Sequence, residues 1–89
     1  MSETTTDHEA IQHWVEERNG RPASVIGTGK DGDAGLLRID FAEDGEDESL
    51  EEISWDQFFA KFEERQLAFL YQDQKANGEQ STFNRLVER

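Results

Sequence analysis

The chain has 89 residues, enough for one small domain, and its 21 acidic against nine basic side chains give a net charge of −12. It contains no cysteine, which excludes a disulfide framework, a thiolate zinc site and a cysteine nucleophile. No apolar run approaches the roughly 18–20 residues of a membrane span, and no signal peptide precedes the first charged residues. We therefore expect a cytoplasmic protein without membrane contact.

The apolar content is small but favours a folded domain. Leu, Ile, Val and Phe make up about 21% of the chain, just above the level of about 20% below which highly charged chains stay disordered. The nine aromatic side chains favour a folded chain over a disordered one, because large rings bury roughly 150–250 Å² each. The uncompensated negative charges repel one another at low ionic strength, and molar salt screens them. We expect a halophilic protein, with an ordinary acidic mesophilic protein as the alternative.

The N-terminal residues are polar and lack any period, so residues 1–6 are predicted to be disordered and residues 7–89 to form a single α+β domain. Thr6 and Glu9 have the spacing of a capping box. The apolar stripe that follows predicts a helix from about Asp7 to Arg18.

A hairpin is predicted after this helix. Asn19 and Gly20 end the helix in a left-handed turn. Residues 23–26 and 35–41 then read as two strands joined by a loose, glycine-rich loop. Residues 43–52 carry seven carboxylates and are expected to form a solvated loop, with a short extra strand at its end as an open alternative.

The second helix is predicted over about Trp55 to Arg65. Ser54 and Gln57 have capping-box spacing, and Lys61 is placed on the solvated side. The apolar face is expected to hold Trp55, Phe58, Phe59, Phe62 and Gln66.

A terminal hairpin is predicted around Asn77-Gly78. A two-residue turn there pairs Phe69 with Leu86 and Leu70 with Arg85, although a bulge or a three-residue turn remains the alternative. The overall order is α-β-β-α-β-β, a small antiparallel or mixed sheet covered on one face by two amphipathic helices.

The sequence motifs that could indicate a binding or catalytic site lack the structural context that such sites require. Residues 27–32 spell G-x-G-x-x-G, but a strand follows where the phosphate-binding fingerprint needs a helix N-terminus. His8 and His13 are five residues apart, which does not bring two ligands onto one helix face. We expect no cofactor, no metal site and no catalytic residue.

Four segments together resemble a known family: residues 13–23, 37–41, 53–59 and 67–72. The family consists of short, uncharacterised prokaryotic proteins often labelled 1,4-alpha-glucan branching enzyme. Branching enzymes resemble the alpha-amylase class, whose large barrel cannot be built from 89 residues, so the resemblance implies no catalytic residue here. An accessory domain of a glucan-active system is the function that the label would imply.

Both faces of the terminal hairpin carry apolar residues, and two short helices cover only one of them. The uncovered face is therefore predicted to be a docking surface for a protein partner or a second copy of the chain. It is built from Leu36, Arg38, Leu70 and Arg85. Our sequence-based hypothesis is a non-catalytic interaction module; a nucleic-acid-associated regulator is a weaker alternative, because a field of −12 surrounds the scattered arginines.

Overall fold

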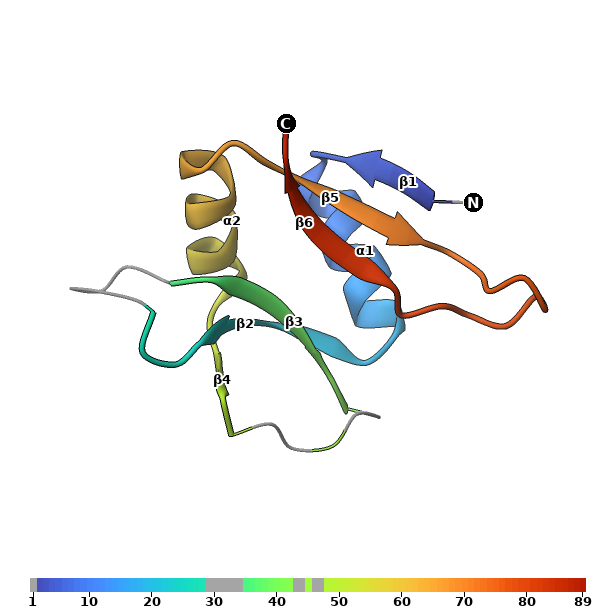
Figure 1. Ribbon diagram of the computed structural model, residues 1–89, viewed down its shortest axis with the longest axis horizontal. Coiled ribbons are helices and arrows are strands. Elements are labelled where there is room, and N and C mark those ends of the chain that lie inside the picture. The colour runs from blue at the N-terminus through green and yellow to red at the C-terminus, as the bar shows by residue number, and fades with distance from the viewer. Residues whose placement is uncertain (1, 29–34, 43–44, 46–47) are drawn as a thin grey trace.

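A computed structural model describes residues 2–28, 35–42, 45 and 48–89 of the chain (Figure 1). Its elements are, in chain order, β1 (Ser2–Thr5), α1 (His8–Glu17), β2 (Gly20–Val25), β3 (Leu37–Phe41), β4 (Leu50–Glu52), α2 (Trp55–Glu64), β5 (Leu67–Gln72) and β6 (Asn84–Glu88). The predicted α+β class is confirmed, and so is the short strand before the second helix. Most of the glycine-rich loop and much of the acidic loop lie outside the described residues.

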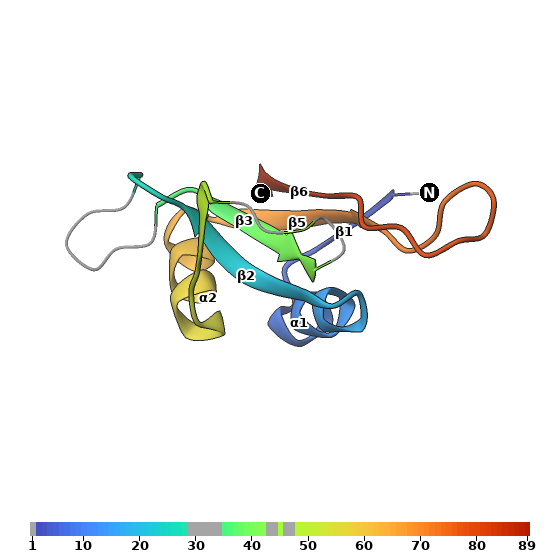
Figure 2. The ribbon, with the colours of Figure 1, turned by 90° about the horizontal axis from the view of Figure 1, so that it is seen from below.

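The strands form two sheets, where the sequence predicts one. Their orders are β1-β5-β6 and β3-β2-β4, and all neighbours are antiparallel. Both helices lie on the same side of the strands (Figure 2). The predicted hairpins are present as β2–β3 and β5–β6, but β3 and β6 remain at the edges of separate sheets.

The prediction of a disordered N-terminus is wrong for residues 2–5, which form the edge strand β1. Thr4 pairs with Leu70 and Thr5 with Phe69. The threonines are β-branched and suit a strand, and β5 offers an edge that no local sequence pattern reveals. The pairing is a tertiary event between segments more than 60 residues apart in sequence.

The N-cap of α1 is Asp7, where the sequence predicts Thr6. The Asp7 carboxylate accepts hydrogen bonds from the backbone N–H groups of Glu9 and Ala10, at 3.0 and 3.4 Å. Aspartate caps a helix as well as threonine does and adds negative charge at the positive end of the helix dipole. The helix therefore begins one residue later than the capping-box pattern indicates.

The second helix matches its predicted start. Ser54 and Gln57 form the expected reciprocal capping box. Its faces differ from the prediction at Lys61, which is buried and lies 3.1 Å from Glu64, and at Gln66, which leaves the helix with a left-handed φ of 52°. A long aliphatic stem lets a lysine cover apolar surface while its ammonium group finds a carboxylate.

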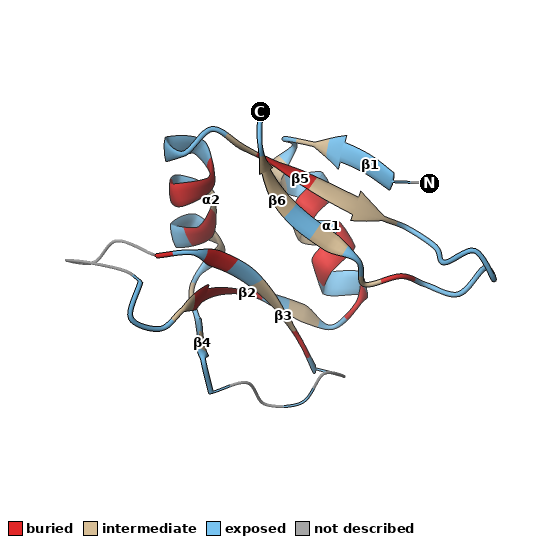
Figure 3. Ribbon diagram, viewed as in Figure 1, coloured by how far each residue is buried: buried red, intermediate tan, exposed pale blue. Residues whose placement is uncertain are grey.

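One hydrophobic core joins the helices to both sheets (Figure 3). Its buried side chains come from both helices and both sheets and are Ile11, Trp14, Val15, Leu37, Phe41, Phe58, Phe62 and Phe69. At Gly20 a Cβ atom would lie 2.9 Å from the Val15 side chain, so only glycine allows the start of β2 to approach α1 this closely.

The predicted register of the terminal hairpin is confirmed, although the turn differs. Phe69 pairs with Leu86 and Leu70 with Arg85. The loop has three residues: the Lys75 N–H donates to the Glu79 carbonyl oxygen at 2.6 Å and the intervening Gly78 has a φ of 88°. The three-residue loop alone would shift the strand pairing by one position. One extra residue between the loop and β6 shifts the pairing back to the predicted register.

Candidate arginine-lined groove

A groove runs between β3 and β6, which lie side by side in Figure 1. Its larger part has a volume of about 510 Å³ and is lined by Leu37, Arg38, Asn84, Arg85 and Leu86. A smaller part of about 130 Å³ is lined by Gly35, Leu36, Leu37, Arg38, Arg65, Leu67 and Leu86. Leu37, Arg38 and Leu86 line both parts, so the two parts adjoin each other.

On the β3 side the groove is bordered by a free sheet edge. The Val25 N–H donates to the Leu36 carbonyl oxygen at 2.9 Å, and hydrogen-bonded pairs of an antiparallel ladder recur at every second residue. The backbone N–H and C=O groups of Leu37, Ile39 and Phe41 therefore point away from β2. No strand among the described residues pairs with them.

The β6 side is a second free edge. The Gln72 N–H donates to the Phe83 carbonyl oxygen at 3.2 Å, and the same alternation follows along the hairpin. The backbone groups of Asn84, Leu86 and Glu88 thus point away from β5, toward the groove. Two edges whose outward backbone groups pair with no described strand border one depression, and of these groups the Leu37 carbonyl oxygen accepts a hydrogen bond from the Arg38 guanidinium at 3.1 Å.

Three arginines around the groove form no ion pair with any described carboxylate: Arg38, Arg65 and Arg85. Every other arginine has one, since Arg18 lies near Asp73, Arg21 near Asp40 and Glu52, and Arg89 near Glu63. The contrast is informative in a chain with 21 acidic residues. The guanidinium groups without a carboxylate are those that line the groove.

The groove has an apolar floor and a charged rim. Leu37 is buried, and Leu86 is half-buried against the core. Their neighbours in sequence, Arg38 and Arg85, lie on the opposite side of the respective strands and are exposed. The alternation of side chains along a strand produces this separation of apolar and basic groups.

The structure brings three of the four predicted surface residues to this groove. Arg38, Arg85 and Leu36 line it, whereas Leu70 pairs with Arg85 but is not among the lining residues. Arg65 was missed, because its position at the end of α2 gave no sign that it approaches β3. No local pattern could have supplied that sign.

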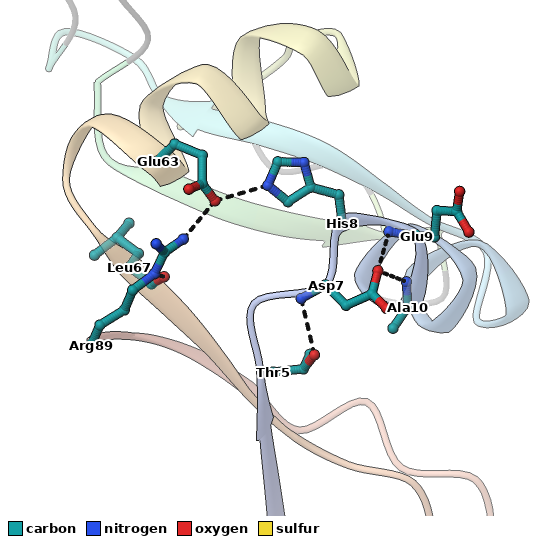
Figure 4. A network of polar contacts seen from close by, with 8 residues as sticks. All are labelled: Thr5, Asp7, His8, Glu9, Ala10, Glu63, Leu67 and Arg89. Carbon is teal, nitrogen blue, oxygen red and sulfur yellow. Dashed lines mark hydrogen bonds and ion pairs between the residues drawn. The ribbon is translucent and has the colours of Figure 1, made fainter.

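A second polar cluster joins the two ends of the chain (Figure 4). His8 Nε2 lies 2.8 Å from Glu63 Oε2, and the Arg89 guanidinium donates to the same oxygen. Arg89 also donates through Nε to the Leu67 carbonyl oxygen at 2.6 Å. The hydrogen bonds from Arg89 and then His8 lower the pKa of Glu63. These groups satisfy one another and connect α1, α2 and the C-terminus, so the cluster is structural.

The described residues hold no group of three or more His, Asp or Glu side chains arranged to bind a metal ion. Within the same residues, no helix has the length and apolar character required to cross a membrane. The chain matches no protein-family model, no curated protein and no solved structure.

Proposed function

We propose that the chain is a non-catalytic interaction module that binds an extended acidic segment of a protein partner in the groove between β3 and β6. The observation that carries the proposal is the convergence of Arg38, Arg65 and Arg85, all without an ion pair to a described residue, on a depression between two free sheet edges. Guanidinium groups bind carboxylates with two parallel hydrogen bonds, which favours an acidic occupant.

The free edges favour an extended peptide over other anions. A strand added to a sheet edge gains main-chain hydrogen bonds irrespective of its sequence, and its side chains supply specificity. Backbone groups of Leu37 and Ile39 on one side, and of Leu86 and Glu88 on the other, are oriented for such pairing. The Leu37 carbonyl oxygen would exchange its hydrogen bond from the Arg38 guanidinium for one from the added strand, which frees Arg38 to bind a carboxylate. Neither a nucleic acid nor a glucan would use these groups in a regular ladder.

A short segment also fits the charge of the molecule. At low ionic strength two whole chains of −12 repel each other, which opposes self-association under those conditions, while a segment adds only a few negative charges. In the salt-rich cytoplasm that we propose for this protein, screening shortens the range of charge interactions to about 3 Å. Binding would then depend on direct arginine–carboxylate contacts and on the strand edges.

The glucan-accessory function and the nucleic-acid function remain competing proposals. Sugar binding usually rests on exposed aromatic faces, and Phe83, at 47% exposure, is the one large aromatic side chain classed as exposed among the described residues. Three arginines are few for a phosphate backbone in this negative field. Both alternatives can be tested in the same binding assay.

The test is selection of displayed random peptides of about ten residues on the immobilised protein, followed by affinity measurement for Arg38→Glu. Lys75→Glu is the matched control, because it changes the net charge equally at an exposed residue of the hairpin that does not line the groove. We expect acidic peptides to be enriched and Arg38→Glu to weaken them at least tenfold, with Lys75→Glu within about twofold.

Three results would overturn the proposal. The first is a selection without acidic enrichment. The second is an equal effect of the two variants, which would indicate a general field effect. The third is Arg38-dependent binding of a single-stranded oligonucleotide or a soluble glucan in place of any peptide, which would favour one of the competing functions.

A further inference from the structure

We infer that the bound segment alternates acidic and apolar residues and inserts one aliphatic side chain into the smaller part of the groove, beside Arg65. The inference rests on the proposed function and specifies its ligand. It follows from how the two edge strands distribute their side chains.

The directions of the side chains on β3 and β6 determine the alternating pattern expected of the bound segment. Leu37 on β3 and Leu86 on β6 face the core, whereas their neighbours Arg38 and Arg85 lie on the outer face. A strand between these edges presents successive side chains to opposite faces. Each inward residue would meet leucines, and each outward residue would meet a guanidinium group without a described ion-pair partner.

The smaller part of the groove has the size of one aliphatic side chain. Its volume is about 130 Å³, and four leucines contribute to its wall. An apolar cavity of about 150 Å³ holds a benzene-sized group, so a leucine or isoleucine side chain fits here and an indole does not. The apolar walls also disfavour a charged side chain that would lose its hydration.

The arginines place the carboxylates on both sides of that apolar residue. Arg38 lines both parts of the groove, whereas Arg65 lines the smaller part and Arg85 the larger part. An acidic residue before and after the inserted side chain would therefore each have a guanidinium within its half of the groove. The recognised pattern is acidic–aliphatic–acidic in an extended conformation.

Two synthetic peptides of identical composition and a third with one substitution test this pattern. The alternating peptide is Asp-Leu-Asp-Leu-Asp-Leu-Asp, and the block peptide places its leucines before its aspartates. A third, alternating peptide carries tryptophan at the central leucine. We expect the alternating peptide to bind at least tenfold more tightly than either of the others, and its binding to fall at least tenfold in Arg38→Glu.

The outcomes separate the two proposals. If the block peptide binds as tightly as the alternating one and both depend on Arg38, the alternation is overturned and the proposed function stands. Equal binding of the tryptophan peptide would overturn the assignment of the smaller pocket. If none of the three binds, and the peptide selection also fails, the inference and the proposed function are both overturned. Leu36→Asn, a change at a 44% exposed wall residue, should weaken the alternating peptide alone.

Discussion

The guanidinium group of Arg18 lies over the indole ring of Trp14, with its central carbon 4.1 Å from the ring centroid. The same group donates hydrogen bonds to the backbone oxygens of Ser81, Trp14 and Asp73, at 2.6, 2.9 and 3.0 Å. Burial lowers the pKa of Arg18, and the carboxylates of Asp73 and Glu17 partly oppose this shift. One buried cation thus attaches the terminal hairpin to the end of α1.

Replacing Arg18 should therefore destabilise the fold more than any exposed arginine would. We expect Arg18→Met to lower the free energy of unfolding by about 2–4 kcal/mol, because several backbone oxygens lose their donor. Arg21→Met is the control: it removes exposed ion pairs and should cost less than about 1 kcal/mol. Urea denaturation measures both, and equal costs would contradict the structural role of Arg18.

The two faces of α2 predict a graded response to truncation of its phenylalanines. Phe62 is fully buried, whereas Phe59 is half-buried, stacked on His8 at 4.0 Å and on Trp55 at 5.3 Å. We expect Phe62→Ala to cost about 3–5 kcal/mol and Phe59→Ala about half as much. Thermal and denaturant unfolding would reveal the difference, and a larger cost at Phe59 would contradict the observed helix face.

The charge of −12 predicts a salt-dependent stability. The melting temperature should rise from low salt to about 1 M KCl, because screening reduces repulsion among the carboxylates. Chloride is preferred over sulfate, whose exclusion from the surface stabilises proteins for a different reason. A melting temperature that stays flat across this range would remove the basis for proposing halophilic adaptation.

The lowered pKa of Glu63 predicts a pH-dependent contribution to stability. Its contacts with Arg89 and His8 favour the ionised carboxylate, so their contribution is present above the ordinary pKa of 4.5 and is lost as the pH falls through the lower pKa of the folded state. Glu63→Gln should therefore be less stable than the wild type at neutral pH, and the difference should shrink on acidification.

The control for this experiment is Glu88→Gln, which removes one exposed carboxylate that takes no part in the cluster. Because acidification also relieves general repulsion, the measured quantity is the difference between each variant and the wild type at the same pH. A pH-independent difference for Glu63→Gln would show that its contacts do not depend on ionisation.

Much of the local structure could be predicted from the sequence. Ser54 and Gln57 specify the start of α2 through hydrogen bonds within one helical turn, and Asn19 adopts the left-handed conformation expected after α1, with a φ of 56°. The Asn77-Gly78 turn signal predicted the pairing of Phe69 with Leu86, which is observed although the loop has three residues. The capping-box spacing predicted Thr6 as the N-cap of α1, whereas Asp7 caps the helix; both residue types are favourable caps.

The candidate groove could be predicted only in part. Arg38 and Arg85 were identified on strands whose other face is apolar, and Leu36 accompanies Arg38. Arg65 was missed, and Leu70 belongs to the outer sheet face beside the groove. The groove residues on strands could be predicted because the alternation of apolar and polar residues is visible in the sequence. The distance between separate elements is not visible there, so the other residues could not be assigned correctly.

The two helices, the two hairpins, the acidic surface and the absence of cysteine chemistry follow from the amino-acid sequence, because each depends on residue types and short spacings. Three relationships follow from tertiary packing: β1 pairs with β5, the strands divide into two sheets, and Arg38, Arg65 and Arg85 meet at one groove. Packing of both sheets against a shared core set these relationships. The free edges of β3 and β6 result from that packing, and no hydrogen-bonding preference of either strand alone specifies them.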